Sequence, residues 1–389
     1  MDSRTIALMR TTFKAVIAAE DGTEQLARSF YAILFADCPH ARDLFPAAMH
    51  VQRERLITAI SYVLDRWEEP DKLFPFLAQR GREHRKYGVR PEHYRAGATA
   101  LKTAVKLFAA TENWTDEVDS AWDEGLRIVT GAMIHAAAKE TTPAVWRGTV
   151  IERREALRNL IIVRLQLDQP MNYAAGQYLS AQIPARPRMW RNLSPAVPAN
   201  ANGEIEFHVR SVPGGWVSPA IVGQTRIGDT WLLGAPMGGL GIPRNPKRSM
   251  LMVGCGTGLA PLRAQLMAMA RRRGNPKVHL FAGGHHPCDL YDLETLSKLT
   301  MANPWLTVTP VIENEENPWW HCEFDNPRPA WPGLEPQVTG QIGKIVASSG
   351  NWADRDVQIA GPPSMVQTTK FRLMAAGTLA RNIRHDPFV

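Results

Sequence analysis

The chain has 389 residues, of which 44% are hydrophobic, and a length of this size predicts two or three domains. No apolar run approaches the roughly 18 residues that a membrane helix needs, and the start, MDSRTIALMRTTFK, lacks the apolar core of a signal peptide, so we expect neither. The net charge is +7, but it is scattered apart from Arg271–Arg273 at the end of a predicted helix, which argues against a nucleic-acid partner.

Residues 1–146 are predicted to be entirely helical. Leu26, Phe30, Ile33 and Leu34 recur at helical spacing, and Asp37-Cys38-Pro39 then breaks the helix. Two further apolar stripes run through residues 94–108 and 118–136. Long helices joined by short turns are typical of a globin. A generic helix bundle would show the same stripes, so the choice between the two depends on polar residues.

The polar residues that favour a globin surround His84, which lies within GREHRKYGVRPEHY (Gly81–Tyr94). A single histidine in a helical segment is most often a surface or core residue. Upstream, Gln52 and Leu56 lie one helical turn apart and share a face. His84 does not stand alone but belongs to an ordered set, which favours a functional role for it over an ordinary surface or core position. The set is Tyr31, Phe45, Gln52, Leu56, His84 and Tyr94.

This ordered set resembles the globin domain of the flavohaemoglobins, which have a distal Tyr and Gln, a haem-contacting Phe and a proximal His before a Pro-Glu-x-Tyr turn. The resemblance implies that His84 is the metal ligand and holds the iron of haem b. It implies that Tyr31 and Gln52 bind O2, that Phe45 and Leu56 wall the pocket, and that the catalytic set is Tyr31, Gln52, His84 and Tyr94.

Near Thr141-Thr142-Pro143 the apolar period changes from that of helices to that of strands. Residues 157–167 and 203–210 are predicted strands, and Gly228-Asp229 indicates a turn. In the second strand, apolar residues alternate with Glu204, Glu206, His208 and Arg210. Residues 147–244 are therefore predicted to form a small antiparallel β-barrel domain.

Three short motifs in the predicted barrel resemble the FAD-binding domain of the ferredoxin-reductase superfamily. The resemblance implies these FAD-binding residues: Tyr178 after Gly176-Gln177, then Arg191, Asn192, Leu193 and Ser194, then Gly214, Gly215 and Ser218. Backbone N–H groups of a glycine turn point at phosphate oxygens, and Arg191 would neutralise phosphate charge. The sequence departs at Leu193, where the family has a Tyr that packs on the flavin. Trp190 is nearby and could replace that ring from a different angle, so we expect FAD in an altered geometry.

From residue 245 to 389, predicted strands and helices alternate, which indicates a mostly parallel sheet covered on both faces. The predicted strands are 250–253, 278–282, 306–312 and 356–360, and the predicted helices are 259–273, 290–301 and 364–377. The Trp- and Pro-rich stretch 313–336 is predicted to be an insertion or a long loop. This part is the predicted NAD(P)-binding domain.

The stretch SMLMVGCGTGLAP (Ser249–Pro261) predicts a strand, a glycine-rich turn and a helix, an arrangement in which the backbone passes close to a pyrophosphate. It resembles the Gly-x-Gly-x-x-Pro loop of the same superfamily, and Gly361-Pro362 resembles its Cys-Gly-Pro run with Ala360 in place of the cysteine. The resemblance implies that the nicotinamide cofactor and flavin contact these residues: Gly254, Gly256, Thr257, Gly258, Pro261, Gly361, Pro362 and Phe388. Two histidines, His285 and His286, fall where a 2′-phosphate would be recognised, and they leave NADH and NADPH both open.

The flavohaemoglobin resemblance extends over essentially the whole chain, and its departures cluster at the flavin and proximal haem sites. Relatives place a Glu on the last globin helix, near the proximal His; that place falls at Lys139 here, with Glu140 adjacent, and Glu83 precedes His84. A proximal carboxylate would raise electron density on the iron. The chain therefore resembles a divergent flavohaemoglobin subgroup.

These observations favour a cytoplasmic oxidoreductase that uses NAD(P)H, FAD and haem b to convert NO and O2 to nitrate. Four well-separated cysteines without a C-x-x-C pair fit a reducing compartment and argue against a disulfide framework or a zinc site. Leu193, Lys139 and Ala360 keep open a dehydrogenase with another reductant, such as D-lactate. A third alternative is a haem-based O2 or gas sensor with a vestigial reductase. We expect a monomer or homodimer with no stable membrane insertion.

Overall fold

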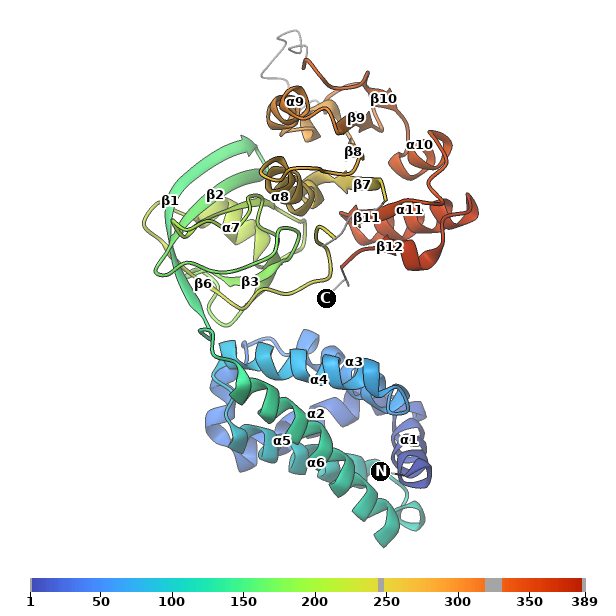
Figure 1. Cartoon of the computed structure of the whole chain (residues 1–389). Helices are drawn as coiled ribbons and strands as arrows, with labels where there is room; N and C mark the ends of the chain where they lie inside the picture. The colour runs from blue at the N-terminus through green and yellow to red at the C-terminus, as the bar shows by residue number, and fades with distance from the viewer. Residues whose placement is uncertain (1, 244–247, 319–330, 387–389) are drawn as a thin grey trace. The chain divides into compact units, whose positions relative to one another are not determined.

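The computed structural model describes residues 2–243, 248–318 and 331–386, and these form two compact units, Met1–Val145 and Trp146–Val389 (Figure 1). Across the described ranges, no helix combines the length and the apolar character that a bilayer crossing requires. The architecture is the predicted one: a helical globin unit, then an antiparallel barrel and a parallel-sheet domain.

The first unit consists of helices alone in its described residues. Its elements are α1 (Ser3–Ala18), α2 (Gly22–Asp37), η1 (Pro39–Leu44), α3 (His50–Asp65), α4 (Pro70–His84), η2 (Arg85–Tyr87), α5 (Pro91–Phe108), η3 (Thr111–Asn113) and α6 (Asp116–Lys139). Proline occupies the first position of α4 and α5, where its missing N–H costs nothing. The apolar stripes of α1, α2, α5 and α6 converge on one core that includes Leu26, Val105 and Trp122.

A glycine sets how closely two of these helices approach. A Cβ at Gly81 of α4 would lie 2.2 Å from the carbonyl oxygen of Met133 in α6, so only glycine allows this packing. The Nη2 atom of Arg85 donates to the carbonyl oxygen of Thr142 at 2.6 Å, just beyond α6. The C-terminal ends of α4 and α6 therefore lie together, and this fixes the end of α4 that carries His84.

The barrel of the second unit is an antiparallel sheet with the strand order β4-β3-β6-β1-β2-β5. Its elements are β1 (Trp146–Leu157), β2 (Leu160–Leu167), β3 (Leu179–Gln182), β4 (Arg191–Leu193), β5 (Glu204–Arg210), α7 (Ser218–Gln224) and β6 (Thr230–Leu233). The N–H of Ala196, just after β4, donates to Glu206 O at 2.8 Å, which brings the two edges of the sheet together. The predicted strand 157–167 is corrected, because residues 158–159 form the turn of a β1–β2 hairpin.

The parallel sheet has the order β10-β9-β8-β7-β11-β12. Its elements are β7 (Met250–Cys255), η4 (Gly256–Gly258), α8 (Leu259–Ala270), β8 (Val278–Gly284), η5 (Pro287–Asp289), α9 (Leu293–Ala302), β9 (Leu306–Ile312), β10 (Val338–Thr339), α10 (Ile342–Ser348), β11 (Asp356–Ala360), α11 (Pro363–Ala375), η7 (Ala380–Asn382) and β12 (Ile383–Arg384). Alternate residues of β7 enter two separate cores, Met250 and Met252 on one face and Leu251 and Val253 on the other. Both faces are covered, as a buried parallel sheet requires.

Candidate functional site

His84, the last residue of α4, faces Tyr94 of α5. Their rings stack with centroids 5.7 Å apart and planes 27° apart. Within the described chain, the Nδ1 atom of His84 and the hydroxyl of Tyr94 are shielded from solvent and have no hydrogen-bond partner. Burial lowers the pKa of His84 to about 4, assisted by the charges of Arg80 and Lys86, and burial raises the pKa of Tyr94 to about 12. Both groups are neutral near pH 7, and a neutral imidazole is the form that binds iron.

No carboxylate reaches this pair among the described residues. Lys139, where relatives have a Glu, is exposed at the end of α6. The Glu140 carboxylate accepts hydrogen bonds from the N–H of Thr142 at 3.2 Å and from its Oγ1 at 2.8 Å. Glu83 forms an ion pair of 2.6 Å with Arg80. His84 Nδ1 and the Tyr94 hydroxyl are therefore two shielded polar atoms with no carboxylate partner among the described residues.

Tyr31, Phe45 and Gln52 lie together although they come from different elements. The Tyr31 hydroxyl donates to the backbone carbonyl oxygen of Gln52 at 3.2 Å, and its ring meets Phe45 edge-on with centroids 5.4 Å apart. Leu56 is half-buried one turn after Gln52 in α3, and both Leu56 and Phe45 pack on the helical core. Burial raises the pKa of Tyr31 above its usual range, so the phenol remains a neutral donor. The neutral imidazole of His84 is a group that can bind a haem iron, and the neutral Tyr31 phenol beside Phe45 can donate a hydrogen bond to a small ligand.

The predicted flavin residues lie on neighbouring strands of the barrel. The N–H of Tyr178 donates to the carbonyl oxygen of Met237, and the carbonyl oxygen of Tyr178 accepts from the N–H of Met237, both at 2.9 Å. Arg191 and Asn192 on β4 have exposed side chains, which are free to meet a ligand at the barrel surface. Leu193 packs on the barrel core, and Ser194 is half-buried.

A glycine turn precedes α7. Gly214 has φ +73°, which L-residues adopt rarely, and the Ser218 Oγ accepts a hydrogen bond of 3.1 Å from the N–H of Val212 across Gly215. The Nε atom of Arg186 donates to Trp216 O at 3.0 Å and holds the turn against the segment between β3 and β4. The exposed backbone of this turn suits an approaching phosphate.

Most of the residues predicted to bind the nicotinamide cofactor lie at the C-terminal ends of β7 and β11, which are neighbours in the parallel sheet. A Cβ at Gly258 would lie 2.3 Å from the carbonyl oxygen of Ala360, so the loop rests directly on the end of β11. Gly256 has φ +55° and open space beside its Cα, while Gly254 is buried at the end of β7. Ligands of open α/β sheets bind at this edge.

The remaining predicted residues border the same edge. Thr257 is half-buried in the loop, and Pro261 is buried in the first turn of α8. Gly361 has φ +156°, and Pro362 caps α11. His285 Nδ1 lies 2.5 Å from a carboxylate oxygen of Glu313, across the ends of β8 and β9. Phe388 and part of the Trp-rich stretch, residues 319–330, lie outside the described residues.

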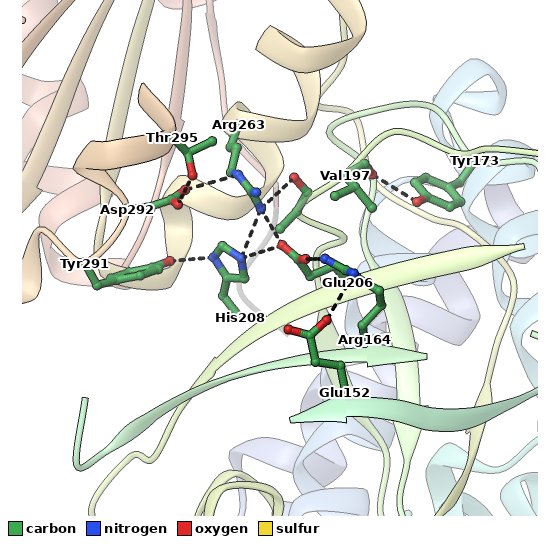
Figure 2. Close-up of polar contacts among 11 residues, drawn as sticks. Glu152, Arg164, Tyr173, Val197, Glu206, His208, Arg263, Tyr291, Asp292 and Thr295 are labelled. Carbon is green, nitrogen blue, oxygen red and sulfur yellow. Dashed lines mark hydrogen bonds and ion pairs between the residues drawn. The ribbon is translucent and has the colours of Figure 1, made fainter. Parts of the chain in front are cut away.

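A buried polar network joins the barrel to the nucleotide half of the same unit (Figure 2). Arg263 of α8 lies 2.5 Å from Glu206 and 3.2 Å from Asp292. His208 receives contacts from Glu206 at 3.1 Å and from the Tyr291 hydroxyl at 2.9 Å. Sequence analysis missed this network. The alternation of polar and apolar residues predicted the strand β5 but carried no signal for a network, whereas Glu206 and His208 are 5% and 4% exposed and both contact Arg263 of α8.

Comparisons with known proteins match three successive parts of the chain. Residues 28–133 match the globin family, residues 124–241 the oxidoreductase FAD-binding domain and residues 252–370 the oxidoreductase NAD-binding domain. The reductase component of a naphthalene 1,2-dioxygenase/salicylate 5-hydroxylase system from Ralstonia sp. is 31% identical over 245 residues, which are 62% of this chain and 68% of that protein. The chain spans 65% of another curated relative, the reductase component of phenol 2-monooxygenase from Pseudomonas sp..

Two solved structures share the fold. The flavohemoglobin from Malassezia yamatoensis, with bound FAD and heme, superimposes with a TM-score of 0.77 at 14% identity and covers 99% of this chain and 98% of its own. The flavohem-like FAD/NAD-binding domain of nitric oxide dioxygenase from Vibrio cholerae has a TM-score of 0.50 at 18% identity and covers 62% of this chain and 98% of its own.

Proposed function

Because the chain belongs to the flavohaemoglobin-like oxidoreductases, with a globin domain ahead of FAD-binding and NAD-binding domains, we propose that it converts NO and O2 to nitrate. This architecture takes electrons from NAD(P)H through FAD to haem. The observation that carries the proposal is the donor set of the globin unit: the neutral His84, the buried Tyr94, and the Tyr31 hydroxyl next to Gln52.

The electron balance of this reaction requires a reductase. Nitrogen gives up three electrons when NO becomes nitrate, and O2 takes up four, so each turnover needs one electron from outside. Haem, when bound, supplies the iron at which O2 is activated. A reduced nicotinamide supplies a hydride, which is enough for two turnovers. A globin without the second unit would stop after the first turnover.

In this proposal each residue has one task. His84 would hold the iron through a ring nitrogen, and Tyr94 packs on that ring and limits its rotation. Tyr31 orients the substrate oxygen by a hydrogen bond, for which its proton must leave the carbonyl oxygen of Gln52. Phe45 and Leu56 keep water out.

The two nucleotide sites would act through backbone geometry. Gly254, Gly256 and Gly258 allow the dinucleotide phosphates to approach the start of α8, and the neighbouring Gly361 sits where the ring end would lie. Tyr178, Arg191 and the Gly214-Gly215 turn would hold FAD. Burial raises the pKa of Cys255 to about 12, so this thiol stays protonated beside the site.

A second candidate is a flavo-haem dehydrogenase that oxidises a 2-hydroxy acid such as D-lactate. One observation in its favour is Leu193, which packs on the barrel core and has no aromatic ring to stack on the flavin. The other is His84, whose Nδ1 atom has no carboxylate partner among the described residues. In this second candidate, the electrons that reduce the haem come from the 2-hydroxy acid and not from a reduced nicotinamide.

The deciding experiment supplies NADH, NADPH or D-lactate to the purified full-length protein and measures NO consumption and nitrate yield. The nitric oxide dioxygenase proposal predicts nicotinamide-dependent NO loss with two nitrates formed per nicotinamide. NO loss that only D-lactate supports would move the function to the second candidate. NO loss without nitrate would reject the dioxygenase.

A further inference from the structure

Three metal-ligating side chains of the globin unit gather where α2 ends and α5 begins. Cys38 caps the C-terminus of α2, His40 lies on η1, and His93 lies in the first turn of α5. One ligand atom from each residue lies within 4.8 Å of the other two. We propose that Cys38, His40 and His93 bind a zinc ion, with water as the fourth ligand.

The distances between the ligand atoms suit a small tetrahedral ion. Zn–S bonds of about 2.3 Å and Zn–N bonds of about 2.0–2.1 Å place ligand atoms roughly 3.3–3.6 Å apart. The Cys38 Sγ lies 3.3 Å from His40 Nε2, within that range. The rings of His40 and His93 have centroids 5.1 Å apart. All three ligand atoms lie within 4.8 Å of one another, so closing the widest gap takes a shift of at most about 1.5 Å. The exposed side chain of His40 leaves room for movement on the solvent side.

Burial separates this cluster from a chance group of surface histidines. Cys38 is 7% exposed and is a free thiol. The Nε2 atom of His93 is shielded from solvent and has no hydrogen-bond partner in the described residues. A shielded polar nitrogen without a partner is costly, and a metal bond would remove that cost. His40, on the solvent side, provides the entry path.

Zinc binding changes where the protons of His93 and Cys38 lie. His93 Nδ1 accepts the backbone N–H of Arg90 at 2.9 Å as part of the α5 cap, so in the neutral ring Nε2 carries the proton. Zinc binding at Nε2 moves that proton to Nδ1 and breaks the bond to Arg90, whose N–H at the exposed helix start then turns to water. The Cys38 thiol loses its proton to solvent as the Zn–S bond forms.

Sequence spacing hid this site. His93 is far along the chain from Cys38 and His40, so no short ligand motif exists, and the cysteine pattern argued against zinc. The fold brings the ligands together because α2 packs against α5 in the core of the globin unit. These two helices carry Tyr31 and Tyr94, so a zinc ion here would fasten together the helices of the distal and proximal sides.

The test uses the full-length protein loaded with haem and FAD, dialysed against a zinc buffer at micromolar free Zn²⁺. We compare the wild type with His40→Ala and His93→Ala; the matched control is His135→Ala, an exposed histidine of α6. The wild type and the control are expected to retain one tightly held zinc. His40→Ala and His93→Ala are expected to lose it, with affinity at least about 100-fold weaker.

Zinc X-ray absorption then identifies the ligands. We expect one sulfur scatterer at about 2.3 Å together with imidazole nitrogens. The exposed His40 serves as the main test residue, because His40→Ala leaves the buried core untouched. Zinc that binds the His40→Ala and His93→Ala proteins as tightly as the wild type, an absorption spectrum without sulfur, or a wild type that retains no zinc would each overturn the site.

Discussion

The Nη1 atom of Arg263 lies 2.5 Å from a carboxylate oxygen of Glu206 and thereby joins helix α8 to strand β5. Arg263 is one turn beyond the glycine loop of the nucleotide site, and Glu206 belongs to the barrel that carries the flavin residues. Both side chains are almost fully buried. This pair therefore fixes how the barrel and the nucleotide half of the second unit pack on each other.

Glu206→Gln is expected to destabilise the second unit, because it removes the nearer of the two carboxylates that neutralise the buried Arg263 and leaves only Asp292 at 3.2 Å. Breaking such a pair costs about 3–5 kcal/mol. The matched control is Glu152→Gln, which removes an exposed partner of Arg164 and is expected to cost less than about 1 kcal/mol. Urea unfolding of the full chain, followed by flavin release, measures both. An equal loss of unfolding free energy in the two variants would show that the Arg263–Glu206 pair does not hold the second unit together.

The same pair predicts a pH dependence. Burial by itself raises the pKa of Glu206, but the hydrogen bond from His208 and the charge of Arg263 outweigh it and hold this pKa well below the usual 4.5. The ionised Glu206 therefore stabilises the fold above about pH 4.5, and this contribution is lost progressively as the pH falls further. Wild-type stability should fall more steeply than that of Glu206→Gln below pH 4.5. Parallel acid-unfolding curves would contradict the prediction.

Apolar periodicity predicted most of the fold, since it determines which face of each element is buried, whereas the set of site residues, which came from motif order, stays a prediction. Two features escaped prediction. Glu206 and His208 look like a solvated strand face, yet a partner helix from a later part of the chain buries them. The β1–β2 turn at Arg158-Asn159 has a local signal in the sequence, because asparagine favours turns over strands. Long-range packing decides the burial of Glu206 and His208, and a single sequence does not encode that packing locally.

The proximal side can be given back a carboxylate. Ala137 is half-buried on α6, one turn beyond the Met133 that packs on Gly81, whereas Lys139 points to solvent. Ala137→Glu is expected to lower the haem reduction potential and raise the iron–histidine stretching frequency, because a carboxylate near His84 increases its basicity. Lys139→Glu is the control and should change neither. Redox titration and resonance Raman spectra measure both effects. A larger change in Lys139→Glu than in Ala137→Glu would show that residue 137 does not face His84.

The flavin site can be given back an aromatic ring. Leu193→Tyr is expected to tighten FAD binding about 2- to 10-fold, the range that an aromatic stacking contact supplies. Leu193→Met fills similar space without a ring and should leave the affinity near that of the wild type. Fluorescence titration of the flavin-depleted protein compares the three. If Leu193→Tyr binds FAD no more tightly than the wild type does, the flavin ring does not lie over position 193.

On the distal side, Tyr31→Phe removes the hydroxyl that contacts Gln52 and keeps the ring packing on Phe45. Loss of one hydrogen bond to the bound ligand, worth about 1–1.5 kcal/mol, should speed O2 dissociation about 10-fold. Tyr62→Phe, on the outer part of α3 against Phe76, is the control. Stopped-flow measurement of O2 release gives the dissociation rates. Equal rates in the wild type, Tyr31→Phe and Tyr62→Phe would show that the Tyr31 hydroxyl does not contact the bound O2.

The most direct measurement mixes the anaerobic full-length protein with NADH or NADPH and records its absorption spectrum over time. The proposed electron route predicts that the flavin band bleaches first and that the haem Soret band then shifts from the ferric to the ferrous position. In His84→Ala the flavin should still bleach while the native haem signal is absent. A wild type whose flavin is reduced while its haem stays ferric, or one that binds no haem at all, would contradict the account.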